Sequence, residues 1–205
     1  MDMARDGAVT VQELRWRRTT LQRFFACLAQ ALEYLHETNL VHQGIQPRHI
    51  LVKLMDSFAS NMTPQIYISD FGSSHRFESD VALEMGKVLD VRAMGCVFLE
   101  MQSTILGHTH TDMFVQYDTL QSDRLDVELR PWITELNQHS CYIDGQQFPR
   151  RLVKARLRSI KSMIADSAGE RLSATDIAMR FGSNDCCFLD PEVPDGQELQ
   201  DGDLP

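Results

Sequence analysis

Apolar residues return at helical spacing in several parts of the chain. The clearest set lies between residues 21 and 35 and defines a single apolar face (Leu21, Phe24, Phe25, Leu28, Leu32 and Leu35). This spacing predicts a helix that begins near a cap at Thr19 or Thr20 and ends near Asn39. Residues 88–101 are apolar on nearly every side, which predicts a fully buried helix with the Asp90 carboxylate capping the N–H groups at its start.

Shorter patterns complete the expected element order. The runs HILVKL (49–54) and QIYIS (65–69) predict a β-hairpin with a long polar connection. Residues 128–136 predict a short helix with Pro131 in its first turn, and CYIDGQQFP (141–149) a loop. Two further helices are expected later, and their markers are Val153, Leu157, Ile160 and Ile164 for one, and Ser173, Asp176 and Gly182 for the other. The order predicts a mainly α chain (α+β overall) with one small hairpin.

The net charge of −9 is concentrated at one end of the chain. Residues 183–205 contain seven acids and no Lys or Arg (Asp185, Asp190, Glu192, Asp195, Glu198, Asp201 and Asp203), and without them the net charge falls to −2. This composition predicts a disordered acidic tail, and the near-neutral remainder disfavours nucleic-acid binding through a basic fold. The outer side of the helix around 150–161 carries six cations, which indicate a solvated face or a docking surface for an acidic partner (Arg150, Arg151, Lys154, Arg156, Arg158 and Lys161).

No apolar run approaches the roughly 18 residues of a membrane span, and the first residues are acidic and lack the apolar core of a signal peptide. We therefore expect an intracellular protein, cytoplasmic or nuclear, without membrane contact. The five cysteines match no zinc pattern and are expected to be buried thiols (Cys27, Cys96, Cys141, Cys186 and Cys187).

Four motifs in order resemble the C-terminal lobe of eukaryotic protein kinases, over residues 19–182. ALEYLHETNLVHQGIQPRHILV resembles the helix and catalytic loop of that family, IYISDFGSS its D-F-G segment, DVRAMGCVFLEM its buried helix and MIADSAGERLSATDI a late conserved segment. The segments DFGSS and GCVFLEM are also similar to those of kinase-like proteins from filamentous fungi. Residues 1–18 are then an N-terminal remnant, and no G-x-G-x-x-G occurs, so the resemblance implies a C-lobe with no N-lobe.

Carried over residue by residue, the resemblance implies a degenerate catalytic loop. His42 matches the structural histidine of the family, but Gln43 replaces the arginine that pairs with an activation-loop phosphate. Gly44 stands where the family has the aspartate that accepts the substrate proton, a kind of group typically worth about 10²–10⁴ in rate. Gln46 replaces the phosphate-neutralising lysine, and His49 replaces the asparagine that holds one magnesium ion.

The D-F-G segment itself is intact. The resemblance implies that Asp70 is a possible Mg²⁺ ligand, although its carboxylate alternatively caps a turn with Gly72. The best match to the family's A-P-E motif is ALE (82–84), which makes the activation segment short. Glu84 is then expected to pair with Arg171 as a structural ion pair.

The preferred interpretation is a degenerate protein-kinase-like domain without catalysis, which acts by binding a protein partner or a second copy over its exposed inter-lobe surface. An alternative is a serine/threonine kinase whose N-lobe is supplied in trans or lost from the gene model, with Mg²⁺ and ATP as cofactors only in that case. A third possibility is a metal-dependent hydrolase using His108, His110 and Asp112. The simpler interpretation of these three residues is a polar surface loop.

Overall fold

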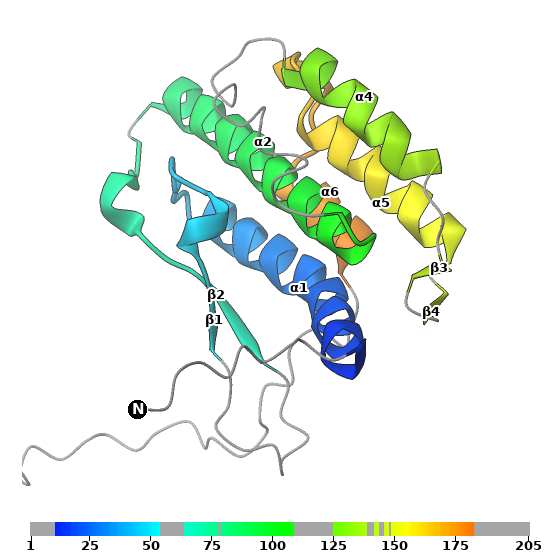
Figure 1. The fold of residues 1–205 in the computed structure, drawn as a ribbon. Helices are drawn as coiled ribbons and strands as arrows, with labels where there is room; N and C mark the ends of the chain where they lie inside the picture. Colours follow the sequence, from blue (N-terminus) through cyan, green and yellow to red (C-terminus); the bar gives the residue numbers. More distant parts are fainter. Residues whose placement is uncertain are drawn as a thin grey trace, which may run out of the picture.

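The computed structural model describes residues 11–53, 64–77, 79–108, 125–138, 142–143, 146–147 and 149–182. These residues form five α-helices and two short antiparallel hairpins (Figure 1). The mainly helical fold with a small β-hairpin is therefore confirmed. No helix within these ranges combines the length and the hydrophobicity needed to cross a membrane.

The first helix, α1, is longer than its apolar face predicted. It spans Val11–Glu37, so Thr19 and Thr20 lie inside it and neither is its cap. The Thr19 hydroxyl donates instead to the carbonyl oxygen of Arg15, four residues earlier, at 3.0 Å. The end of the helix agrees with the prediction, because Asn39 adopts a left-handed φ of 56° just beyond it.

The predicted hairpin is present with a defined register. Strands β1 (Ile50–Lys53) and β2 (Gln65–Ile68) pair antiparallel, with Ile50 opposite Ile68 and Leu51 opposite Tyr67. Ile50 and Ile68 pack against the core, whereas Leu51 and Tyr67 are 52% and 47% exposed. The register also places the residues before β1 beside those after β2, which brings the two kinase-like motifs together.

Helix α2 (Asp80–Ile105) begins eight residues before the predicted start at residue 88. Asp90 consequently lies inside the helix, and the prediction that it caps the N-terminus is wrong. The early turns escaped prediction because Val81, Met85 and Leu89, spaced four residues apart, are all exposed and do not form a core-facing stripe. From Asp90 onward the helix is almost entirely buried, as expected.

The C-terminal half contains three helices. Helix α4 (Leu125–Gln138) begins three residues earlier than predicted and has Pro131 inside it. A hairpin of β3 (Tyr142–Ile143) and β4 (Gln146–Gln147) replaces part of the predicted loop. Helices α5 (Arg150–Met163) and α6 (Ala174–Phe181) follow, and the predicted capping box is present, with the Asp176 N–H donating to Ser173 Oγ at 3.1 Å.

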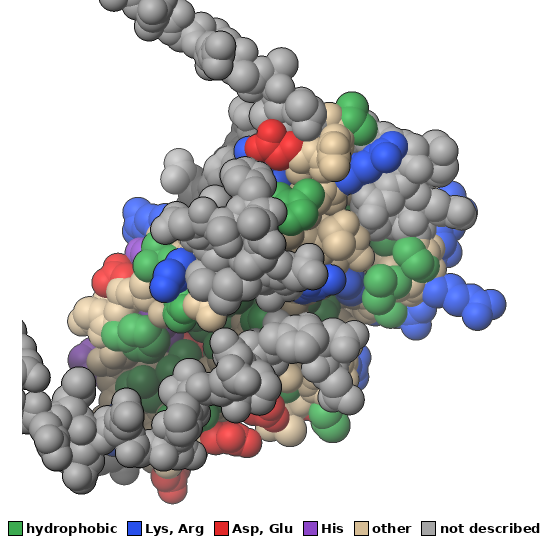
Figure 2. All heavy atoms as spheres, turned by 90° about the horizontal axis from the view of Figure 1, so that it is seen from below, with side chains coloured by type: hydrophobic (Ala, Val, Ile, Leu, Met, Phe, Trp, Pro, Cys, Tyr) green, Lys and Arg blue, Asp and Glu red, His purple; other side chains and the backbone are tan. Residues whose placement is uncertain are grey.

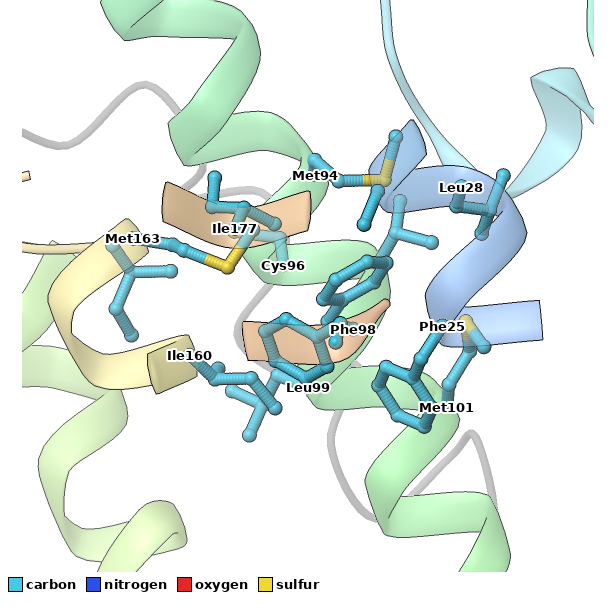
Figure 3. Close-up of a cluster of buried hydrophobic side chains, with 14 of the residues drawn as sticks. Phe25, Leu28, Met94, Cys96, Phe98, Leu99, Met101, Ile160, Met163 and Ile177 are labelled. Carbon is cyan, nitrogen blue, oxygen red and sulfur yellow. The ribbon is translucent and has the colours of Figure 1, made fainter. Parts of the chain in front are cut away.

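The core forms where α1, α5 and α6 surround α2 (Figures 1 and 3). Phe25, Phe98 and Phe181 come from three different helices and meet with ring centroids 4.8–5.5 Å apart. Gly95 permits the close approach of α5, because a Cβ there would lie 2.8 Å from Ile164 Cγ2. Of the cysteines in the described residues, Cys96 is a buried free thiol as expected, whereas Cys27 is disulfide-bonded, contrary to the prediction.

Candidate functional site

The loop that corresponds to the catalytic loop is anchored by a buried carboxylate. Asp90 is 1% exposed, and its two oxygens accept the backbone N–H groups of His42 at 2.7 Å and Gln43 at 2.8 Å. Gln43 has a left-handed φ of 58°, which a residue with a side chain adopts only when its surroundings hold it there. Asp90 thus binds the backbone of this loop and does not cap the end of a helix.

His42 is fully buried, and it joins this loop to the D-F-G segment. Its Nε2 lies 2.9 Å from the carbonyl oxygen of Ser69 and its ring packs against Phe71, with centroids 4.7 Å apart. Because a carbonyl only accepts, Nε2 carries the proton in this contact. These contacts agree with the structural role that the family resemblance implies for His42.

Two positions at which the family has an aspartate and a lysine are Gly44 and Gln46 in this chain. Gly44 has no side chain, and a Cβ built there would meet nothing closer than His42 Nδ1 at 3.6 Å. Gln46 is half-buried, and its carbonyl oxygen accepts from the His49 N–H at 2.9 Å, which closes the turn Pro47–His49. The backbone at Gly44 would therefore admit a Cβ at ordinary van der Waals distance from His42.

His49 and Asp70 form a direct contact that the sequence did not predict. The Nδ1 atom of His49 lies 2.5 Å from the Gly44 carbonyl oxygen, and its Nε2 lies 3.0 Å from Asp70 Oδ2. A carbonyl and a carboxylate both accept hydrogen bonds, so the His49 ring lies between two acceptors. Arg48 Nε also donates to His49 Nε2, at 3.3 Å.

The turn after Asp70 follows from its backbone geometry. Asp70 has a left-handed φ of 65° and precedes the short 3-10 turn Phe71–Ser73, but its carboxylate makes no capping hydrogen bond to that turn. The alternative of a side-chain cap is therefore wrong. The hairpin register instead directs this carboxylate toward His49.

The described residues of the site differ from the magnesium ligands of the family. Mg²⁺ prefers oxygen ligands, and the asparagine position of the family offers the imidazole of His49 instead. Among the described residues, no three His, Cys, Asp or Glu side chains form a metal-binding group. With His49 Nε2 3.0 Å from Oδ2, a metal ion has to compete with this side chain for the Asp70 carboxylate.

The predicted ion pair between Glu84 and Arg171 is replaced by other contacts. Glu84 is exposed and pairs with Lys87 at 3.2 Å. Arg171 donates to three carbonyl oxygens, those of Ala165 at 2.6 Å, Asp166 at 3.1 Å and Val88 at 3.2 Å. Burial lowers the pKa of Arg171. Through these three hydrogen bonds the guanidinium group joins the loop before α6 to α2. Arg171 is thus structural, through carbonyl groups and not through Glu84.

A pair of carboxyl groups near Arg171 was not singled out by the sequence. The Asp126 N–H donates to Asp166 Oδ1 at 3.2 Å, and Arg92 Nη2 lies 3.6 Å from the same oxygen. Burial, followed by the hydrogen bond to Asp126, raises the pKa of Asp166, whereas that hydrogen bond lowers the pKa of Asp126. Asp166 is therefore the carboxyl group of this pair that is protonated more readily.

The hydrolase hypothesis receives little from the structure. His108 lies just after α2 and packs its ring against Trp132, with centroids 4.8 Å apart. His110 and Asp112 lie outside the described residues. A metal site at these three positions stays an untested prediction.

Comparisons with known proteins agree with the motif order. Residues 9–112 match the family described as protein tyrosine and serine/threonine kinase. The chain is 23% identical over 164 residues to the cGMP-dependent protein kinase, isozyme 2 forms cD5/T2, of Drosophila melanogaster, a match that covers 75% of this chain and 16% of that protein. It is 33% identical over 52 residues to the serine/threonine-protein kinase CAK1 of Saccharomyces cerevisiae, covering 25% of this chain and 13% of that protein. The chain thus spans only about a sixth or less of the length of these relatives.

Proposed function

Because the chain belongs to the protein tyrosine and serine/threonine kinase family, we propose that it is a degenerate kinase-like domain that transfers no phosphate and acts by binding a protein. The observation that carries the first half is the contact between His49 and Asp70 at 3.0 Å. In this arrangement the His49 side chain lies against Asp70, the one carboxylate that remains at the matched positions to hold a metal ion.

The chemistry of the loop supports the same conclusion. A general base in phosphoryl transfer must lie within hydrogen-bonding reach of the substrate hydroxyl. Gly44 has no group to offer at that position, and the other ionisable side chains of the loop are already engaged in structural contacts. His42 is fully buried against Ser69, and His49 is held between Gly44 and Asp70.

Thermal unfolding of the chain with and without millimolar ATP and Mg²⁺ tests this half. A ligand present at about 100 times its Kd adds roughly 2.7 kcal/mol of stability, which raises the Tm of a protein of this size by several degrees. We expect no shift for the natural chain. A rise of several degrees would refute the proposal and favour the alternative, an ATP-dependent serine/threonine kinase whose N-lobe comes from elsewhere.

The variant His49→Asn identifies the cause of an absent shift. It introduces the residue that the family has at this position and removes the imidazole ring from Asp70. If nucleotide raises the Tm of the variant but not of the natural chain, His49 is the group that blocks the metal. If neither chain responds, the loss of nucleotide binding has a wider origin than this contact.

The second half of the proposal rests on exposed apolar side chains. Leu51 and Tyr67 face each other across the hairpin and are about half exposed, and we call them the hairpin patch. Phe71 of the D-F-G segment is 41% exposed. Exposed apolar surface of this kind marks protein interaction sites when it is contiguous, so we assign to this side of the molecule a protein partner or a second copy.

Sedimentation velocity and binding of an apolar dye test this assignment. We expect the natural chain to self-associate or bind dye, and the variant Leu51→Ser/Tyr67→Ser to do both less. The matched control Val127→Ser/Leu152→Ser removes two exposed apolar side chains from α4 and α5 and should leave both readouts unchanged. A monomeric natural chain without dye binding would contradict the assignment.

A further inference from the structure

A groove between α4 and α5 is lined mainly by cations. It encloses about 290 Å³, with Leu157 and Ile133 as apolar lining residues. Its charged lining residues are Arg130 from α4, Lys154, Arg158 and Lys161 from α5, and one carboxylate, Asp126. Figure 2 shows Lys and Arg side chains gathered at the right-hand edge of the molecule, the side on which Figure 1 places α4 and α5.

The positive charge of this groove is not compensated within the described part of the chain. Asp126 is already engaged, because Arg130 donates to its Oδ2 at 3.2 Å. Lys154, Arg158 and Lys161 are exposed, and none of them has an ion pair or hydrogen bond to another described residue. Since like charges three and four residues apart on a helix repel, this row of α5 favours an anionic partner.

Another cation of α5, Arg156, does not line the groove and contacts α1 instead. Arg156 lies over the ring of Phe25 at 4.7 Å, and burial lowers its pKa to about 10, so it remains charged at neutral pH. Phe181, at the end of α6, stacks on that same Phe25 ring with centroids 5.5 Å apart. The described chain therefore ends, at Gly182, close to α5.

The segment that follows has the complementary charge. Residues 183–205 contain seven carboxylates and no Lys or Arg. Helix α5 is about 21 Å long by the rise of 1.5 Å per residue, a length that about six or seven extended residues span. The 23 residues after Gly182 thus exceed the length needed to cross from α6 and lie along the groove.

We propose that the acidic segment 183–205 binds in cis to the groove between α4 and α5, through its carboxylates and the row Lys154, Arg158 and Lys161. The proposal is independent of the kinase-like site, because the groove shares no residue with it. In this proposal the tail occupies the groove of its own chain. An acidic segment of another protein then has to displace the tail before it can bind there.

Competition by a synthetic peptide of residues 183–205, carrying a fluorescent label, tests the proposal on full-length chains. In one chain the seven tail acids are changed to the corresponding amides, Asp→Asn and Glu→Gln, which leaves the groove free. We expect the peptide to bind this chain at low salt and to bind the natural chain at least about tenfold more weakly, because a tethered competitor acts at millimolar effective concentration. Binding should weaken steeply between 50 mM and 500 mM salt.

A groove variant, Lys154→Gln/Arg158→Gln/Lys161→Gln, is made in the background with the neutralised tail. It should weaken peptide binding at least about tenfold. The control variant Arg23→Gln/Lys53→Gln/Arg76→Gln changes the net charge equally by removing exposed cations from other elements, and it should bind like its parent. Circular dichroism confirms that both variants fold.

Three results would overturn the proposal. The first is no peptide binding to the chain with the neutralised tail. The second is equal binding to the groove and control variants, which would indicate a non-specific attraction between charges. The third is equal binding to the natural chain and the chain with the neutralised tail, which would show that the tail does not occupy the groove.

Discussion

The variant Asp90→Asn isolates the anchor of the degenerate loop. The change keeps the shape of the side chain, so it leaves no cavity behind, and it converts one of the two acceptor oxygens into an N–H donor. In the natural chain these oxygens accept the N–H groups of His42 and Gln43 at 2.7 and 2.8 Å, in a site where Asp90 is 1% exposed.

The expected cost follows from these two bonds. One backbone N–H loses its acceptor inside the protein, which costs about 1–3 kcal/mol. The other keeps a neutral acceptor in place of a charged one, and neutral hydrogen bonds are roughly half as strong. We therefore expect the free energy of unfolding to fall by about 2–4 kcal/mol, a large part of the roughly 5–15 kcal/mol of a typical domain.

Urea unfolding, followed by circular dichroism, measures this change from the midpoint at constant slope. The control Glu37→Gln neutralises an exposed acid on α1 and should remain within about 0.5 kcal/mol of the natural chain. If Asp90→Asn also remained within that margin, the carboxylate would not be the anchor of the loop, and the left-handed Gln43 would need another explanation.

Two further variants test the packing and the pH dependence. Gly95→Ala should lower the free energy of unfolding by about 1 kcal/mol or more, because its Cβ would lie 2.8 Å from Ile164 Cγ2, and this clash outweighs the better helix propensity of alanine. Gly169→Ala is the control, because a Cβ there would meet nothing within 4 Å. Equal stabilities of the two variants in urea would contradict the expected clash. In the folded chain the pKa of Asp166 is raised, so its contribution to stability is present at low pH and is lost as pH rises through and above the usual aspartate range. Asp166→Asn is neutral at every pH and should therefore gain stability relative to the natural chain between about pH 4 and pH 7. A constant difference in urea midpoint across that range would refute the raised pKa of Asp166.

The elements that the sequence predicted well are those with a local signal. The capping box of α6 needs only Ser173 and Asp176, three residues apart, and the hairpin needs only two β-prone runs. The start of α2 was missed because the exposed apolar residues Val81 and Met85 give no core-facing stripe, and local pattern reasoning depends on such stripes.

The candidate site depended on information that local pattern does not contain. His49 and Asp70 are brought together by the register of the hairpin, in which Ile50 lies opposite Ile68. The positions flanking such a pair become neighbours, so the register of the predicted strands was the one signal that would have suggested their contact. The sequence singled out Asp90 but predicted the wrong role for it. A carboxylate that binds a loop 47 and 48 residues away cannot be distinguished in the sequence from a helix cap.

The packing of α1 against α6 has a consequence during synthesis. Phe25 reaches its final environment only when Phe181 has been made and has stacked upon it. At about 5–20 residues per second, the ribosome needs roughly seven to thirty seconds to translate from the end of α1 to that point. For that interval the apolar face of the nascent helix lacks the part of its native cover that α6 provides, so α1 is where a chaperone should first contact the newly made chain.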